Sequence, residues 1–388
     1  MNIKKPLRIG LVVGETSGAI LAQGMLKEIL QRYPDAVVEG IGSQQLIDMG
    51  MNSLFDMNEL SVMGLVEVLK HLPRLMHIRK TVIRHFINSP PDVFIGVDAP
   101  DFNLTVEKKL KAVGIPTVHY VSPTVWAWRE KRIHKIAKAT NLVLGVFPFE
   151  NEIYAKYNIP FKFVGHTMAD SIPIEIDKIA AKDALQLRAD NLYLALLPGS
   201  RKREIDALLN VFIDTYQLLK QKHPNMRIII PAVNLEREEQ IKEMLKDNYP
   251  ELTDYIISRR PAREVMMASD LVLLASGTAA LEAMLCKSPM VVAYKMSGLT
   301  YMMMKRLYKP AYFALPNILA NKSLVPEFLQ EQVNPDNLAH HLEQVMSEER
   351  EDLLLDYTAI HNSLAKSADV ESSKAILSLI GESQNHDD

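Results

Sequence analysis

Two acidic residues, Asp98 and Glu15, lie at the ends of predicted strands, where they could take part in proton transfer. Asp98 is the last residue of the apolar run DVFIGVD (92–98), and Pro100 follows two residues later. Because proline has no N–H to continue a ladder, the strand should stop there and leave Asp98 at the edge where ligands bind. A carboxylate in that place is a natural general base, and we expect Asp98 to act as one. Asp101 is expected instead to cap the following helix.

The turn GETSGA (14–19) joins the first predicted strand to the next helix. It looks like a dinucleotide-binding loop but lacks the GxGxxG spacing, and Glu15 stands where a phosphate would have to approach. Because a carboxylate repels an anion, we expect Glu15 to face hydroxyl groups or a developing positive charge. The alternative is a purely structural turn in which Ser17 caps the helix.

A strand-to-helix turn in the second half of the chain is rich in cations. In LPGSRKREI (197–205), Ser200 ends the turn and Arg201 opens a run of three basic residues at the helix start. The helix dipole disfavours cations there by a few tenths to ~1 kcal/mol each. An anion held by backbone amides and by Arg201 would remove this conflict. The alternative is a basic turn that only faces solvent.

A second turn of this kind occurs in ASGTAALEA (275–283). Ser276, Gly277 and Thr278 precede a helix of small residues, which would let a ligand approach the backbone closely. Glu282 follows about one helical turn later, within reach of ribose hydroxyls. Two anion-binding turns indicate a nucleoside diphosphate, and the absence of GxxxxGK[ST] argues against ATP chemistry.

Residues 57–80 combine an apolar stripe at helical spacing with interleaved basic residues. A core helix would explain the stripe, and so would a helix that rests on anionic lipid. The stripe residues assigned to lipid contact are Val66, Leu69, Leu72 and Leu75.

The sequence leaves two alternatives for the two tryptophans, Trp126 and Trp128. They could pack internally, or they could line a sugar or acyl site.

Length and composition predict two large folded domains. The chain has 388 residues, of which 48% are hydrophobic and 23% charged, and domains average roughly 150 residues. A net charge of −3 does not predict a nucleic-acid binder. The single cysteine, Cys286, excludes an intrachain disulfide and a zinc-type cluster. The first apolar run is too short for a secretory segment, and no window reaches ~18 apolar residues, so we expect a cytoplasmic protein without a spanning segment.

Continuous apolar runs alternate with longer helical patterns, as is typical of strands buried on both faces of a parallel sheet. The pattern restarts near residue 190, so the expected fold class is α/β, with two Rossmann-like doubly wound domains facing across a cleft. We place the domains at 1–170 and 171–388, the second with a helical tail from about Asn334. The predicted strands are 7–13, 36–42, 92–98, 115–121, 141–147 and 161–166, then 192–200, 226–233, 254–258, 270–278 and 288–295.

Together, these motifs resemble those of the lipid-A-disaccharide synthase family. Its members are glycosyltransferases of the GT-B fold. The resemblance implies that the chain joins UDP-2,3-diacylglucosamine to 2,3-diacylglucosamine 1-phosphate, releasing UDP and a β-1,6-linked disaccharide phosphate. It implies Asp98 as the base and Glu15 in support, with Arg201, Glu282 and Asn317 on the nucleotide side. The pieces that carry it occur in order along almost the whole chain: GETSG, SVMGLVEVL, IGVDAPDFN, HYVSPTVWAWR, FPFE, VGHTMAD, LLPGSRKREI, LASGTAALEAML, PMVVAYKM and LPNILA.

The resemblance also implies partners for each domain. Residues 1–170 would bind the acceptor and contact the cytoplasmic face of the inner membrane, and 171–388 would bind UDP. The C-terminal helices of this family suggest a homodimer in which two copies of the chain swap these helices. No cofactor or metal is expected, because Arg201 and two helix N-termini could stabilise the departing UDP, and no DxD-type carboxylate pair is evident.

One position departs from the family pattern, which has an aspartate where this chain has Ala19. If that aspartate orients the acceptor or Glu15, activity would be reduced. One alternative is a hydrolysing UDP-N-acetylglucosamine 2-epimerase, which would need further acidic and histidine groups around the sugar and no lipid surface. Another is a catalytically silent UDP-sugar-binding protein, which only the change at Ala19 supports.

Overall fold

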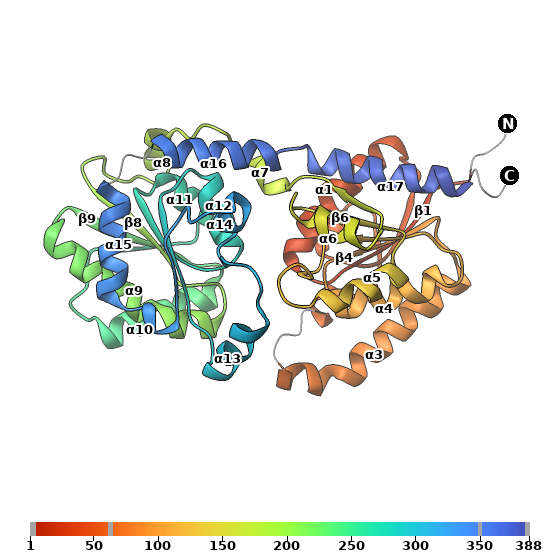
Figure 1. Cartoon of the computed structure of the whole chain (residues 1–388), viewed down its shortest axis with the longest axis horizontal. Coiled ribbons are helices and arrows are strands. Elements are labelled where there is room, and N and C mark those ends of the chain that lie inside the picture. The colour runs from red at the N-terminus through yellow and green to blue at the C-terminus, as the bar shows by residue number, and fades with distance from the viewer. Residues whose placement is uncertain (1–4, 61–64, 348–350, 385–388) are drawn as a thin grey trace. The chain divides into compact units, whose positions relative to one another are not determined.

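The computed structural model describes residues 5–60, 65–347 and 351–384, and it divides into two compact α/β units (Figure 1). The first unit contains the chain up to Asp170 together with the stretch from Ser363 onward, and the second contains Ser171–Asn362. Each unit is built around one parallel sheet. In the described part of the chain, no helix combines the length and the apolar character needed to cross a bilayer.

The first unit has a seven-stranded sheet in the order β3-β2-β1-β4-β5-β6-β7. The order reverses between β1 and β4, so the loops after these strands flank the topological switch point, where ligands bind in such sheets. Val13 and Val97 are register partners, so β1 and β4 end side by side. The strands are β1 (Arg8–Val13), β2 (Val37–Gly42), β3 (Asn52–Asp56), β4 (Val93–Val97), β5 (Thr117–Tyr120), β6 (Leu142–Gly145) and β7 (Phe161–Phe163).

Helices connect these strands and cover their apolar side chains. Leu11 of β1 and Phe94 of β4 are fully buried in one core with Met25 and Ile29 of the first helix. The helices are α1 (Thr16–Arg32), α2 (Gln44–Asp48), α3 (Leu65–Asn88), α4 (Pro100–Lys111), α5 (Ile133–Ala139), α6 (Glu150–Lys156) and α7 (Thr167–Ser171), with 3₁₀ turns at Met57–Glu59 and Glu130–Arg132.

The C-terminal helix α17 (Ala368–Gln384) packs in the first unit, which differs from the predicted domain border. Ile376 is fully buried in the core that β1 and α1 share. The Lys162 ammonium lies 2.9 Å from the Glu371 carboxylate, and the Asp170 carboxylate accepts hydrogen bonds from the amides of Ser367 and Ala368 at the start of α17. Helical periodicity predicts a helix here, but it does not say which core the apolar face will join.

The second unit has a six-stranded sheet in the order β10-β9-β8-β11-β12-β13. Its switch point lies between β8 and β11, whose residues Leu197 and Leu274 are register partners. The strands are β8 (Leu192–Leu197), β9 (Met226–Pro231), β10 (Tyr255–Ser258), β11 (Leu271–Ala275), β12 (Met290–Tyr294) and β13 (Glu327–Leu329). The helices are α8 (Lys178–Ala184), α9 (Lys202–Lys222), α10 (Leu235–Asn248), α11 (Ala262–Ala268), α12 (Thr278–Leu285), α13 (Gly298–Leu307), α14 (Leu315–Ala320), α15 (Pro335–Ser347) and α16 (Glu351–Leu364), with a 3₁₀ turn at Gln330–Gln332.

Two edge strands and one helix boundary differ from the sequence predictions. β3 and β13 were not predicted, because edge strands are only partly buried and lack the long apolar run of a central strand. The helix expected within 57–80 begins at Leu65 and continues to Asn88. Val62, the first residue of the predicted stripe, lies outside the described residues.

Candidate active site

The backbone after β4 adopts an uncommon conformation at two consecutive residues. Asp98 and Ala99 have φ angles of +53° and +42°, in the left-handed region that residues other than glycine seldom enter. Each such residue costs about 1–3 kcal/mol, and strain of this kind collects at functional sites. The partly exposed Asp98 side chain accepts a hydrogen bond from the Ala99 amide at 2.8 Å. The turn therefore holds one carboxylate in place at the switch point.

The turn after β1 packs against this strained turn through two glycines. A Cβ atom on Gly14 would overlap the Cβ of Ala99, and one on Gly18 would lie 3.5 Å from the Asp98 Cβ. Glu15 lies between these glycines and occupies the N-cap position of α1, although its side chain makes no capping hydrogen bond. The structure thus brings the turns that carry Glu15 and Asp98 into contact at one sheet edge.

Asn103, which the sequence analysis missed, ties the two strand ends together. Its fully buried Nδ2 lies within hydrogen-bonding distance of the carbonyl oxygens of Val12 (3.3 Å), Val97 (3.3 Å) and Asp98 (2.8 Å). The available signal was an amide side chain shortly after the strand, on the helix face that also buries Val106 and Leu110. Asn103 acts as a positioning residue for the Asp98 turn.

A buried polar pair lies behind the strand that carries Asp98. Glu107 of α4 and His119 of β5 are both fully buried, with 2.7 Å between Oε1 and Nδ1. Burial raises the pKa of the Glu107 carboxyl, because desolvation outweighs the attraction of His119. Gly96 makes room for this pair, since a Cβ there would overlap the Glu107 carboxylate. The pair is shielded from solvent, so its role is to fix α4 against the sheet.

Neither helix cap proposed from the sequence is used. Ala99 occupies the N-cap position of α4, and Pro100 takes the first helical position, for which its fixed φ is suited. Asp101 therefore falls in the first turn, where it pairs with Arg132. Likewise, α1 begins at Thr16, so Ser17 lies inside the helix. Both helices start earlier than expected, because the chain turns directly out of the strand.

Both tryptophans make internal contacts. Trp126 packs edge-on against Phe149, with 4.8 Å between ring centroids. Trp128 donates a hydrogen bond from Nε1 to the Thr124 hydroxyl at 3.3 Å, and the Arg129 guanidinium lies 4.0 Å from its ring centroid. These contacts favour the packing alternative for both residues.

In the second unit, an internal carboxylate occupies the anion site expected at the start of α9. Glu204 Oε2 accepts hydrogen bonds from the amides of Ser200 (3.1 Å) and Arg201 (3.3 Å), and Oε1 accepts one from the Arg201 guanidinium at 3.0 Å. A glutamate three residues after the cap is the recognised signal for such a contact, but the sequence analysis did not use it. The basic turn therefore carries its own counter-ion.

The turn after β11 lies beside this one, because β8 and β11 end together at the switch point. Gly277 has a φ of +157°, and a Cβ there would meet no atom within 4 Å, which leaves open space before the first turn of α12. Ser276 is partly exposed and Thr278 is exposed. Burial raises the pKa of the Glu282 carboxyl, against the opposing charge of Arg263.

Asn317 lies in the first turn of α14, and its side chain does not face solvent. Its fully buried amide donates to the Val325 carbonyl (2.9 Å) and the Glu327 carboxylate (3.0 Å), and accepts from the amides of Leu324 (2.7 Å) and Val325 (2.8 Å). Because these bonds use the whole side chain, Asn317 orders the loop rather than reaching a ligand in this structure.

The apolar stripe of α3 divides between the core and the surface. Ile78 and Val82 are fully buried, whereas Leu72 is 42% exposed and Met76 40% exposed. Leu75 is partly buried, and the side chains of Val66 and Leu69 lie outside the described residues. The C-terminal half of α3 thus packs into the core, whereas Leu72 and Met76, near its middle, present apolar side chains on the surface.

Comparison with known proteins identifies the family. A family model described as lipid-A-disaccharide synthetase matches residues 9–377. The chain is 53% identical over 377 residues to the lipid-A-disaccharide synthase of Alteromonas mediterranea, covering 97% of this chain and 99% of that protein. It is 51% identical over 376 residues to the synthase of Aliivibrio fischeri, covering 97% and 98%. The chain belongs to the lipid-A-disaccharide synthase family.

Membership of the lipid-A-disaccharide synthase family confirms the predicted glycosyltransferase activity. Solved structures confirm the fold class: a kitacinnamycin glycotransferase (TM-score 0.64, 12% identity, 97% and 99% coverage) and the UDP-GlcNAc 2-epimerase of Neisseria meningitidis (TM-score 0.62, 13% identity, 97% and 100% coverage). At such low identity these likenesses show the fold alone. The epimerase alternative therefore rests on fold, whereas the synthase assignment rests on sequence.

Proposed function

We propose that this chain transfers 2,3-diacylglucosamine from its UDP-linked form to 2,3-diacylglucosamine 1-phosphate, with Asp98 as the general base. The acceptor hydroxyl attacks the anomeric carbon while UDP leaves from the opposite face, so the configuration inverts. A carboxylate beside the attacking oxygen takes the proton as the new bond forms. The observation that carries this assignment is the strained Asp98–Ala99 turn, which fixes a carboxylate at the switch point of the first sheet.

Glu15 has a supporting role in this proposal. Its turn packs against the Asp98 turn through Gly14 and Gly18, so two acidic residues border one edge of the sheet. Their combined negative potential favours the positive charge that develops on the reacting sugar. Glu15 would therefore stabilise the transition state, while Asp98 accepts the proton.

The donor's diphosphate is assigned to the turns before α9 and α12. It would take over the amides of Ser200 and Arg201 from the Glu204 carboxylate and add a contact to the Arg201 guanidinium. Fixed positive groups there would stabilise the charge that grows on the leaving UDP. The space in front of Gly277 admits the ligand, and Glu282 is the candidate partner of the ribose. Ser276 and Thr278 complete this proposed nucleotide site.

Peripheral membrane contact is assigned to the surface formed by α3, α4 and α5. Leu72 and Met76 project from α3, and Arg79 of α3 donates a hydrogen bond to the Asp101 carbonyl of α4 at 3.4 Å, so the two helices lie together. An exposed apolar stripe flanked by cations is typical of a helix that rests on anionic lipid.

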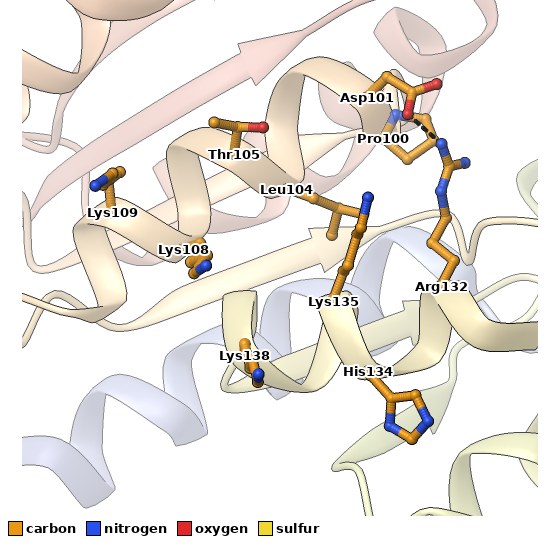
Figure 2. Close-up of a pocket in the computed structure, with 10 residues that line it drawn as sticks. All are labelled: Pro100, Asp101, Leu104, Thr105, Lys108, Lys109, Arg132, His134, Lys135 and Lys138. Carbon is orange, nitrogen blue, oxygen red and sulfur yellow. Dashed lines mark hydrogen bonds and ion pairs between the residues drawn. The ribbon is translucent and has the colours of Figure 1, made fainter.

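A basic groove between α4 and α5 supports this assignment (Figure 2). The groove encloses about 420 Å³, and its one carboxylate, Asp101, is already paired with Arg132. Each lysine near an anionic membrane surface adds about 1 kcal/mol of attraction. Within the described ranges, none of the groove's four lysines has an ion-pair partner: Lys108, Lys109, Lys135 and Lys138.

The swapped homodimer that the resemblance implies stays a prediction. It would exchange α17, whose Ile376 is buried against the core of the first unit, between two copies of the chain. Light scattering on the purified protein would measure the mass directly.

Replacement of Asp98 by asparagine tests the proposed mechanism. Asp98→Asn keeps the shape of the turn but cannot accept the proton, so kcat should fall by about 10²–10⁴-fold. UDP affinity should stay unchanged, because the donor site is assigned to the other unit. Asp101→Asn is the matched control, since it neutralises an exposed acid three residues away. Turnover of Asp98→Asn near the wild-type rate would refute the assignment and make Glu15 the next candidate.

A further inference from the structure

The helix α13 follows β12 in the second unit, and none of its described side chains is fully buried (Figure 1). Tyr301 and Met304 on one face are partly buried, and the other described side chains of the helix are exposed. A helix as short as this is marginal in water by itself, because helices in proteins are stabilised mainly by packing an apolar face. Within the described residues, the outer face of α13 has nothing packed against it.

The start of α13 is nevertheless fixed to the unit. The Gln330 side chain holds the backbone of Met296, accepting a hydrogen bond from its amide at 2.7 Å and donating one to its carbonyl at 3.0 Å. Ser297 then caps the helix by accepting a hydrogen bond from the Thr300 amide at 3.3 Å. The helix is thus positioned by the unit while its outer face stays uncovered.

The outer face of α13 is rich in apolar side chains. Met302 is 58% exposed, Met303 48% and Leu307 43%. Met303 and Leu307 are four positions apart and therefore lie on the same face, with Met302 beside them. Apolar side chains that gather on an exposed face mark contact with another molecule.

The charged residues of α13 are all positive. Neither Lys305 nor Arg306 has an ion-pair partner within the described ranges. Arg306 lies one helical turn after Met302, so this cation shares the apolar face. Between Glu282 and Glu327, the sequence contains six lysine and arginine residues and no aspartate or glutamate. Apolar side chains among cations fit a partner that offers hydrocarbon beneath a negatively charged surface.

We propose that α13 is a lipid-contacting helix that lays its outer face on an anionic bilayer. The two exposed methionines and Leu307 enter the boundary between headgroups and acyl chains, while the two cations meet the lipid phosphates. A second copy of the chain is a poorer occupant, because three partly exposed side chains fall far short of the roughly 800 Å² per partner of a stable protein interface. The contact proposed for the first unit is a separate surface, so this inference depends neither on it nor on sugar transfer.

Flotation with vesicles of phosphatidylglycerol and phosphatidylcholine tests the proposal on the full chain. Met302→Ser combined with Met303→Ser should lower the partition coefficient by about tenfold or more, because it removes apolar surface from the contact. Lys305→Gln combined with Arg306→Gln should lower it by about fivefold per charge at low salt, and this effect should shrink as salt rises. Both variants should keep the wild-type unfolding midpoint, because all four side chains are exposed.

Matched controls change side chains of the same kinds elsewhere in the second unit. Leu235→Ser combined with Leu355→Ser replaces two apolar residues that are 60% and 67% exposed and have acidic neighbours. Lys222→Gln combined with Lys242→Gln removes two lysines that are already paired with glutamates. Neither control should change the partition coefficient measurably.

A background of Leu72→Ser with Met76→Ser separates α13 from the surface proposed on α3. This protein should keep a measurable partition that Met302→Ser with Met303→Ser abolishes, and no residual partition would show that α13 does not bind lipid by itself. Wild-type partition in both α13 variants would overturn the proposal, and so would equal partition of the wild type into pure phosphatidylcholine. A raised KM for the donor with unchanged partition would also overturn it, because the face would then hold the substrate's acyl chains.

Discussion

Replacing Glu204 by glutamine should strengthen UDP binding, although the residue makes no proposed contact with the ligand. The Glu204 carboxylate holds the Ser200 and Arg201 amides and the Arg201 guanidinium, which are the groups assigned to the diphosphate. The ligand must therefore displace this carboxylate before it can bind there. Glutamine can still reach the backbone amides from the same helical position, so α9 should remain capped.

The size of the effect follows from the contacts that are weakened. A hydrogen bond to a charged group contributes about 1.5–3 kcal/mol and one between neutral groups about 0.5–1.5 kcal/mol. The Arg201 side chain is 59% exposed, so solvent screening limits its ion pair with Glu204 to ~1 kcal/mol or less. We expect displacement to become about 1 kcal/mol easier, which is a roughly fivefold lower Kd for UDP. Removing a negative charge beside the diphosphate acts in the same direction.

Isothermal titration calorimetry with UDP measures this effect directly. Arg201→Ala is the opposing variant and should weaken binding by about 1.5–3 kcal/mol, because it removes a charge-assisted contact. Glu264→Gln is the matched control: Glu264 also lies in the first turn of a helix of this unit, 3.5 Å from an arginine. A Kd that is unchanged or higher in Glu204→Gln would refute the idea that the diphosphate uses these donors.

Two further predictions concern the first unit. Leu72→Ser combined with Met76→Ser should reduce binding to anionic vesicles and leave the unfolding midpoint unchanged, because both side chains are already exposed; unfolding of the variant would show that the stripe belongs to the core. Burial raises the pKa of the Glu150 carboxyl to about 8. In the unfolded chain, the Glu150 carboxyl ionises near its ordinary pKa of 4.5. The stabilisation by the buried neutral carboxyl is therefore complete below pH 4.5 and is lost as the pH rises to about 8. Glu150→Gln should remove this loss of stability between pH 5 and pH 8. Denaturant unfolding followed by tryptophan fluorescence reports on this unit, since Trp126 and Trp128 are the chain's only tryptophans. If the variant keeps the pH dependence of the wild type, Glu150 is not its source.

Local signals in the sequence were sufficient to locate the two main turns of the proposed site. Asp98 could be placed at a strand end because an apolar run stops at a proline, and this depends only on neighbouring residues. The basic run after Ser200 likewise indicated that a negative charge lies near the start of this helix, because cations are unfavourable at a helix N-terminus. The repeated alternation of apolar runs and helical patterns determined the α/β class for the same reason, since burial on both faces leaves its mark along each strand.

The counter-ion of the basic turn had a local signal that the sequence analysis did not use. A bound anion was expected near Arg201, yet Glu204, three residues after the cap, turns its carboxylate back to the same amides. Asn317 shows a true limit of local signals, because its four hydrogen bonds join residues up to ten positions apart and cannot be inferred from its own neighbours. Which polar groups meet depends on how loops fold back on themselves.

Contacts between distant segments were decided only by the fold. Asn103 reaches the end of β1, 91 residues earlier in the chain, and α17 buries Ile376 in the first unit although it follows the whole of the second. Periodicity and turn chemistry are local properties of the chain, so the sequence by itself determined the elements and the residues at their ends. Burial and pairing depend on what lies across the core, and for that reason the tertiary structure alone decided which of those residues share a site.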